Sequence, residues 1–409
     1  MPPIDRALII GAGIAGPAAA LALRRIGVDA VVYEAHPKPA DHIGSFLNTA
    51  SNGIAALAEL GLADEVSRAG IATPRMTFWS GTGKRLGDVA NGTQLADGHT
   101  STTIRRGELN RILREAALAA GIPIESGRRL VGAQTTSEGV RAVFDDGSST
   151  SGGLLIGADG IHSDLRRIID PDAKPPRYTG LLSIGGQTTG IDVGAEPGTF
   201  NMMFGRDAFF SHLVREPGDV WWFANLPEPH EPQRGMLAAV PAAAWRTRLL
   251  ETFAHDRGPA RELITGAAGD LGAYAIHDLP TVARWHRGPM VLVGDAAHAT
   301  SPSAGQGASM ALESALQLAV CLRDAGSVTG GLADYEAVRR PRVERVVRYS
   351  ARLSGSKTAG PIGRRLRDLA MPFALEHFAN PGSHAWMYEH TISLDGGAVE
   401  SWTTDESDA

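Results

Sequence analysis

The sequence predicts an α/β protein in which a Rossmann-like dinucleotide-binding domain is interleaved with a mostly antiparallel-sheet domain and is followed by C-terminal helices. Three glycine-containing turns, near residues 10, 157 and 294, support this prediction, because each follows an apolar run and precedes a helical pattern. Region 176–275 supports it too, because its alternating and aromatic stretches are typical of antiparallel strands. Since turns lie on both sides of that region, the two domains are expected to alternate along the chain.

The first turn carries a dinucleotide-binding fingerprint. An apolar run at 7–10 is followed by the pattern G-x-G-x-x-G, a helical pattern over 17–26 and a second apolar run over 28–33. This order is the context that the fingerprint requires, since its glycines permit a tight turn, close approach of a pyrophosphate and close helix–sheet contact. Glu34 ends the second run, where its carboxylate can accept hydrogen bonds from ribose hydroxyls. The binding residues predicted here are Gly11, Gly13, Ala15, Gly16 and Glu34.

The turn near residue 294 predicts a further contact with an anionic, flat cofactor. An apolar strand at 290–293 runs into Gly294 and Asp295, and a loop with proline and glycine then leads into a helix over 308–323. Asp295 can accept hydrogen bonds from sugar or polyol hydroxyls, and the helix start favours negative charge beside it. A simple helix cap is the alternative role for this aspartate.

The middle turn is the least specific of the three. An apolar strand at 154–156 runs into a Gly-Asp-Gly turn that contains Asp159, and a basic helix start follows. Taken alone, this pattern favours an ordinary strand-to-helix turn.

Together the three motifs resemble those of the class A flavoprotein monooxygenases, the aromatic hydroxylase family of the para-hydroxybenzoate hydroxylase type. That family has the fingerprint near residue ten, a central Asp-Gly motif and a C-terminal Gly-Asp motif, in the order found here. Segment 103–109 is similar to the family's R-x-x-L helix start, with Arg106 as its arginine, and segment 335–342 to the stretch after the Gly-Asp helix. The resemblance spans residues 4–350. The chain departs from the family in the 41–52 loop, which leaves the flavin contacts of that loop undefined.

The resemblance implies FAD as the cofactor and NADPH or NADH as a transient reductant. It places the fingerprint glycines and Glu34 at the adenosine diphosphate half of FAD. It places Arg106 and Asp159 near the pyrophosphate, with Asp159 ordering its turn, and it places Asp295 at the ribityl chain. The residues that it places at the edge of the isoalloxazine ring are Pro302, Gly305, Gln306 and Gly307.

The resemblance also implies a single-component monooxygenase. In such enzymes NAD(P)H reduces the flavin, O2 forms a hydroperoxide at flavin C4a, and one oxygen atom passes to an aromatic or polycyclic small molecule. Two alternatives stay open: a flavin-dependent reductase of the geranylgeranyl-reductase type, and a flavin-bearing protein that sequesters a ligand without turnover. Oxygen uptake and NAD(P)H consumption that a substrate stimulates would distinguish a monooxygenase from both alternatives.

The motifs divide the chain into interleaved segments. The FAD-binding domain is expected to comprise 1–72, 102–175 and 276–330, and the substrate domain 73–101 and 176–275. Residues 331–409 are expected to form C-terminal helices that end in an acidic tail over 400–409.

The substrate domain supplies the candidate substrate contacts, because family topology places its sheet over the flavin. His212 is the only catalytic candidate among them, since a neutral imidazole can take a proton from a phenol. An ordinary core role is the alternative for each residue, and His298 in the third motif is interpreted as structural. The candidate substrate contacts are Gln187, Met203, Phe204, Phe209, His212 and Phe223.

Composition excludes several other classes of protein. A net charge of −6, without a long basic face, argues against nucleic-acid binding, and the basic run at 339–348 is interpreted as the solvated side of a helix. The single cysteine, Cys321, excludes an intrachain disulfide and a multi-cysteine metal site, and no metal site is predicted. No secretory leader and no apolar run of about 18 residues is found, so we expect a cytoplasmic protein without membrane insertion. We expect it to be a monomer or a homodimer.

Overall fold

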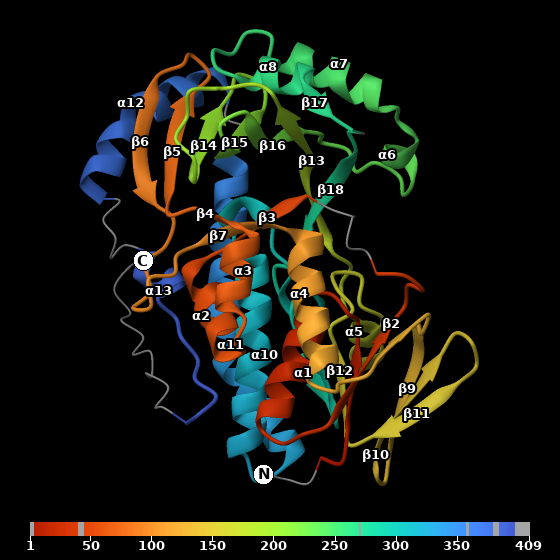
Figure 1. The fold of residues 1–409 in the computed structure, drawn as a ribbon. Helices are drawn as coiled ribbons and strands as arrows, with labels where there is room; N and C mark the ends of the chain where they lie inside the picture. Colours follow the sequence, from red (N-terminus) through yellow and green to blue (C-terminus); the bar gives the residue numbers. More distant parts are fainter. Residues whose placement is uncertain (1–3, 40–44, 270, 357–359, 379–383, 397–409) are drawn as a thin grey trace.

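The computed structural model describes residues 4–39, 45–269, 271–356, 360–378 and 384–396. The departing stretch at 41–44 and the predicted acidic tail lie outside the described residues. Within them, no helix is long and apolar enough to cross a membrane. A six-stranded sheet lies toward one end of the molecule and an eight-stranded sheet at the other, with long helices running between them (Figure 1).

The six-stranded sheet forms the core of the dinucleotide-binding half. Strand β1 pairs in parallel with both β2 and β12, and all four of its residues are buried. Such two-sided burial explains why its sequence is a continuous apolar run instead of an alternating one. The strands, in their order across the sheet, are β19 (His286–Arg287), β20 (Met290–Leu292), β12 (Leu154–Gly157), β1 (Ala7–Ile10), β2 (Ala30–Glu34) and β8 (Ile124–Ser126).

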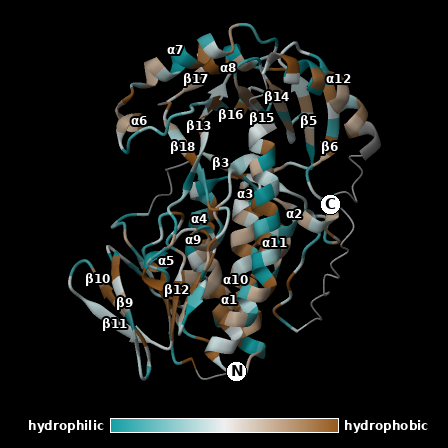
Figure 2. Cartoon of the chain, turned by 180° about the vertical axis from the view of Figure 1, so that it is seen from behind, coloured by the Kyte–Doolittle hydropathy of each residue, from teal (hydrophilic) through white to brown (hydrophobic). Residues whose placement is uncertain are grey.

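Helices surround this sheet and extend from it toward the other one. Helix α1 is rich in alanine, which lets it pack closely against α10, and α11 lies alongside α10 (Figure 2). The helices of this half are α1 (Ala15–Arg25), α2 (Ser51–Glu59), α3 (Ala63–Ala69), α4 (Arg106–Ala119), α5 (Asp164–Ile169), α9 (Asp295–His298), α10 (Gly307–Asp324) and α11 (Val328–Ser356). A short 3₁₀ helix, η1 (Pro302–Ala304), precedes α10.

The eight-stranded sheet is mostly antiparallel, and only its β14–β5 pair is parallel. Its strands are β17 (Ala267–Ala268), β13 (Arg177–Thr189), β16 (Asp219–Pro227), β15 (Phe209–Glu216), β14 (Thr199–Phe204), β5 (Arg75–Ser80) and β6 (Arg85–Ala90), with β18 (Ala273–Asp278) paired to β13. The 73–101 segment thus joins the sheet built from 176–275. The helices of this half are α6 (Met236–Ala239), α7 (Ala242–Thr252) and α8 (Ala260–Thr265).

Two three-stranded sheets and two further helices complete the structure. One small sheet consists of β9 (Leu130–Thr136), β10 (Gly139–Phe144) and β11 (Ser149–Gly152). The other consists of β3 (Phe46–Thr49), β4 (Ile71–Ala72) and β7 (Thr102–Arg105). The C-terminal helices are α12 (Pro361–Phe378), which packs against β6, and α13 (Ala385–Tyr388), which packs against α2.

Helix α11 corrects the interpretation of the basic run at 339–348. Arg339 is fully buried and Arg342 is largely buried, and both form ion pairs with Glu313 of α10. For these two arginines the interpretation was wrong, because the sequence alone does not reveal a buried carboxylate on a neighbouring helix, and that carboxylate is what allows arginine to lie in the core. Arg345 and Arg348 are exposed, as the interpretation expected. Cys321, by contrast, is buried among apolar side chains, as a small core residue would be.

Candidate active site

One large cavity lies between the two major sheets and takes its walls from both. Its volume is about 1290 Å³, above the roughly 300–1,000 Å³ of a typical single-ligand pocket. The cavity therefore has room for a dinucleotide and a second small molecule.

The glycines of the fingerprint have distinct roles at one end of the cavity. A Cβ atom on Gly16 would lie 1.9 Å from the backbone oxygen of Gly11, so this position needs glycine for α1 to pack against the turn. A Cβ atom on Gly13 would meet nothing within 4 Å, and Gly13 lines the cavity. Open space at the start of α1 is what a pyrophosphate needs, since the first N–H groups of a helix bind anions.

Glu34 lies at the end of β2 with both carboxylate oxygens already engaged. Oε2 accepts a hydrogen bond from the backbone N–H of Ala12 (2.8 Å), and Oε1 accepts one from the N–H of His36 (2.9 Å). These bonds fix the carboxylate at the cavity wall. Each oxygen has a second acceptor position, so Glu34 can still accept hydrogen bonds from ribose hydroxyls.

Asp295 and Arg106 form the middle of the cofactor-facing wall. The Asp295 side chain is exposed to the cavity, and no described residue donates a hydrogen bond to it. Burial raises the pKa of the Asp295 carboxyl, an effect that the Arg106 guanidinium partly offsets. Asp295 begins the short helix α9, but its position in the cavity suits hydroxyl groups of a ligand.

Asp159 orders the Gly-Asp-Gly turn. Its Oδ2 accepts hydrogen bonds from the backbone N–H groups of Asp164 (2.8 Å) and Leu165 (3.1 Å), at the start of α5. Its Oδ1 is buried and has no hydrogen-bond partner in the described structure. Burial raises the pKa of this carboxyl despite the two N–H bonds. The geometry agrees with the expected indirect role, because the side chain holds the turn that lines the cavity.

The loop from η1 to α10 forms the far end of the cofactor wall. Pro302, Gly305, Gln306 and Gly307 all line the cavity. Gln306 is the N-cap of α10, and no side chain caps the helix start. The first N–H groups of α10 are thus available to a ligand with negative charge. Two hydroxyls anchor the loop to α11, since Ser301 Oγ lies 2.8 Å from Ser350 Oγ.

These features fit FAD. The open space at Gly13 can hold the pyrophosphate, and the Asp295 carboxylate, which accepts no hydrogen bond from the described protein, can accept hydrogen bonds from ribityl hydroxyls. The uncapped N–H groups at the start of α10 can bind the electron-accepting ring. Two other predicted residues act by packing: a Cβ atom on Gly294 would lie 2.7 Å from the Cβ of Ala15. Their small size lets the third motif approach the start of α1.

The opposite wall of the cavity is aromatic and comes from one face of the eight-stranded sheet. Three of the six candidate substrate contacts, Phe204, Phe209 and Phe223, line it. Strands β5 and β14 of the same sheet contribute further side chains to this wall, and β3 of a small sheet extends it. Large apolar lining residues that the sequence interpretation did not single out include Phe46, Met76, Phe78, Phe200 and Met202.

The other three candidates do not reach the cavity. Met203 belongs to the core cluster between the sheet and helices α7 and α8. His212 shares that face, because it lies two residues from Phe210 on β15 and alternate residues of a strand point the same way. Gln187 accepts a hydrogen bond from Arg105 and donates one to Asp219 (2.7 Å). The expectation that they contact substrate is therefore corrected: the sequence pattern locates the strands but does not define which face meets the cavity.

The C-terminal helices also line the cavity, which no motif indicated. Tyr349 of α11 and His384, next to α13, place Oη and Nε2 2.9 Å apart at the cavity wall. Burial lowers the pKa of His384 and raises that of Tyr349, so both side chains are neutral near pH 7. Arg367 of α12 lies over the Phe204 ring, with its guanidinium carbon 4.4 Å from the ring centre. His298 does not line the cavity: it lies buried, 2.8 Å from Ser314 Oγ.

Comparisons with known proteins agree with this site. The family model described as FAD binding domain matches residues 6–350. The chain is 32% identical over 349 residues to the FAD-dependent urate hydroxylase of Klebsiella pneumoniae, covering 84% of this chain and 88% of that protein. It is 30% identical over 398 residues to the 3-amino-4-hydroxybenzoate 2-monooxygenase of Streptomyces cremeus, covering 95% and 96%. The crystal structure of Klebsiella pneumoniae HpxO complexed with FAD and uric acid superposes with a TM-score of 0.82 at 28% identity, covering 94% and 97%.

Proposed function

We propose that this chain, which belongs to the FAD binding domain family and is an FAD-dependent hydroxylating monooxygenase, uses NADPH or NADH as a transient reductant and inserts one oxygen atom from O2 into an aromatic or polycyclic small molecule. One observation carries the proposal: a single cavity joins the cofactor wall to an aromatic wall. A substrate on the aromatic wall would lie beside the flavin ring without a second active site. The oxygen-transfer route implied by the sequence resemblance is part of the proposal.

The residues of this chain divide the work of binding and protection. Bound FAD supplies the two-electron chemistry and the activation of O2. The start of α10 stabilises negative charge on the ring, and the phenylalanine-rich sheet face excludes water from it. Tyr349 and His384 are the groups proposed to hold or pass a proton at the substrate, in place of His212.

The composition of the aromatic wall supports a flat, largely apolar substrate. The wall offers aromatic faces and methionine sulfur, which pack on planar rings. The relatives' names are consistent with a ring compound, since they refer to urate and to an aminohydroxybenzoate. We propose that FAD is held by the segments before 72, at 102–175 and at 276–330, and substrate mainly by 73–101 and 176–275.

The test is turnover with purified protein. We expect a flavin spectrum, and NADPH or NADH oxidation with oxygen uptake stimulated by some member of a panel of phenols and polycyclic aromatics. The product should be heavier by one oxygen atom, and ¹⁸O₂ should label it. Bound flavin with ligand binding but no stimulated oxygen uptake across the panel would contradict the proposal and favour a ligand-sequestering protein.

A further inference from the structure

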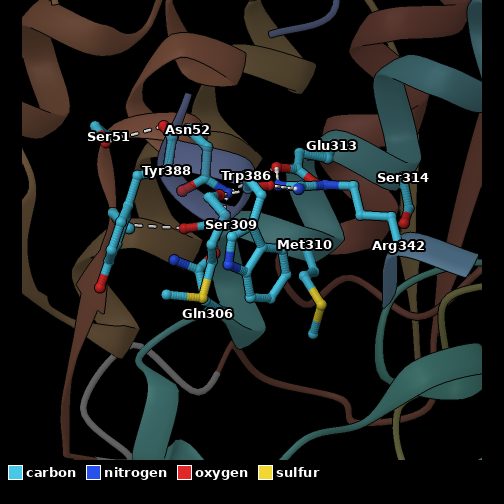
Figure 3. A network of polar contacts seen from close by, with 12 residues as sticks. Ser51, Asn52, Gln306, Ser309, Met310, Glu313, Ser314, Arg342, Trp386 and Tyr388 are labelled. Atoms are coloured by element: carbon cyan, nitrogen blue, oxygen red, sulfur yellow. Dashed lines mark hydrogen bonds and ion pairs between the residues drawn. The ribbon is translucent and has the colours of Figure 1, made fainter. Parts of the chain in front are cut away.

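A buried polar network lies behind the cofactor wall and is centred on Glu313 of α10 (Figure 3). Arg342 donates from Nη2 to Glu313 Oε1 (2.7 Å) and from Nε to Oε2 (3.0 Å). Arg339 Nη2 lies 2.9 Å from Oε2. Asn52 of α2 donates from Nδ2 to Oε1 (2.6 Å). Glu313 is therefore held by groups from two other helices.

The charge of Glu313 determines how the neighbouring amides are oriented. The two arginines hold the pKa of Glu313 well below its usual range, so the carboxylate is ionised and only accepts hydrogen bonds. The Asn52 atom that contacts it must then be the NH2 group. The same NH2 group lies 3.0 Å from a side-chain atom of Gln306, which must be the acceptor Oε1. The Gln306 NH2 group is left as a buried donor without a partner among the described residues.

The network ends at the cavity. Gln306 is the N-cap of α10, is fully buried and lines the cofactor wall. Helix α2 is held against α10 by a separate contact, in which the backbone N–H of Ala50 donates to Ser309 Oγ (3.1 Å). The mutual position of α2 and α10 thus does not depend on the Asn52–Gln306 hydrogen bond alone.

We propose that Glu313 and Asn52 are positioning residues for the flavin: they fix the buried amide of Gln306, the N-cap residue of α10, and so hold the start of α10 with its uncapped N–H groups at the cofactor wall. Backbone N–H donors at the start of α10 favour a ring that gains negative charge on reduction. Losing the fixed orientation should weaken FAD binding and shift the flavin reduction potential to a more negative value.

The variant Asn52→Asp tests the orientation with almost no change in size. A carboxylate at position 52 cannot donate to Gln306 Oε1, so the Gln306 amide must rotate to donate its NH2 group to Asp. The two arginines that pair with Glu313 carry one positive charge more than that carboxylate, and a second carboxylate in the network would offset it. Gln306→Leu removes the amide altogether. Ser309→Ala is the matched control, because it removes a buried hydrogen bond between the start of α2 and α10 that does not involve Asn52, Gln306 or Glu313.

FAD dissociation constants and reduction potentials would be measured without substrate for these variants and for the Asn52→Asp/Gln306→Leu pair. We expect Asn52→Asp and Gln306→Leu each to weaken FAD binding about tenfold and to lower the potential. The double variant should be no worse than Gln306→Leu alone, and Ser309→Ala should keep the wild-type potential. Thermal melting of each apoprotein checks folding.

Either of two results would overturn the inference: additive effects in the double variant, or a potential of Asn52→Asp equal to that of wild type. If Asn52→Asp does not fold, Asn52→Ser replaces it in the same cycle, because its shorter side chain removes the amide that donates to Gln306 Oε1 and adds no charge. The measurement uses FAD alone, so its failure is distinct from failure of the proposed monooxygenase reaction.

Discussion

The six-stranded sheet presents mainly backbone and short polar groups to the cavity, whereas the eight-stranded sheet presents large side chains. In the first, the contacts follow strand ends and helix starts, at Gly13, Glu34 and Asp295. In the second, they follow the alternation along strands, as with Phe204 and Phe223. The first wall depends on the backbone geometry of residues that are close in the sequence. The second wall depends on which face of the sheet is covered by helices.

The largest effect that sharpens this comparison concerns two neighbouring glycines. Gly16→Ala should prevent folding, because the new Cβ would lie 1.9 Å from the Gly11 oxygen. Gly13→Val should leave the apoprotein's melting temperature near that of wild type but weaken FAD binding about a hundredfold, ~2.8 kcal/mol, because its side chain enters the pyrophosphate space. Soluble yield, melting temperature and FAD titration measure both effects. A Gly13→Val protein with wild-type FAD affinity would show that the pyrophosphate lies elsewhere.

The second test compares adjacent residues of β16 on opposite faces. Trp222 is fully buried, stacks on Phe210 and donates to Thr188 Oγ1 (3.0 Å), so Trp222→Ala should lower the free energy of unfolding by about 3–5 kcal/mol. Phe223→Ala on the cavity face should cost less stability and raise the substrate KM. Urea unfolding and steady-state kinetics separate the two outcomes. Equal losses of stability with an unchanged KM for Phe223→Ala would contradict the assignment of faces.

The third and smallest effect concerns pH. Burial lowers the pKa of His212 to about 4, below the usual 6.5, so the unfolded chain takes up this proton first as pH falls. The folded state should therefore lose up to about 3 kcal/mol between pH 6.5 and pH 4 through His212 alone. His212→Leu should make the decline of unfolding free energy over that interval shallower. An identical slope in variant and wild type would show that the imidazole is not buried in neutral form.

Local sequence determined more of the cofactor wall than of the substrate wall. The fingerprint, the Asp-Gly turn and the Gly-Asp loop predicted the cavity positions of Gly13, Asp159 and Asp295, because strand, turn and helix follow each other in the chain. The same reasoning located strands β13–β16 but included Met203 and His212 among the pocket residues. Alternation separates the two faces of a strand, but it does not say which face a helix covers.

The sequence by itself determined the α/β class, because glycine spacing and apolar runs are local constraints on backbone geometry, and the resemblance of its three motifs to a known family indicated the family and the cofactor. Only the tertiary structure decided which aromatic side chains face the cavity, that the C-terminal helices close it, and that Arg339 and Arg342 are buried. The physical reason is distance along the chain. Glu313 meets Asn52 across 261 residues and Arg342 across 29, and the stability of a buried charge depends on partners that only folding brings together.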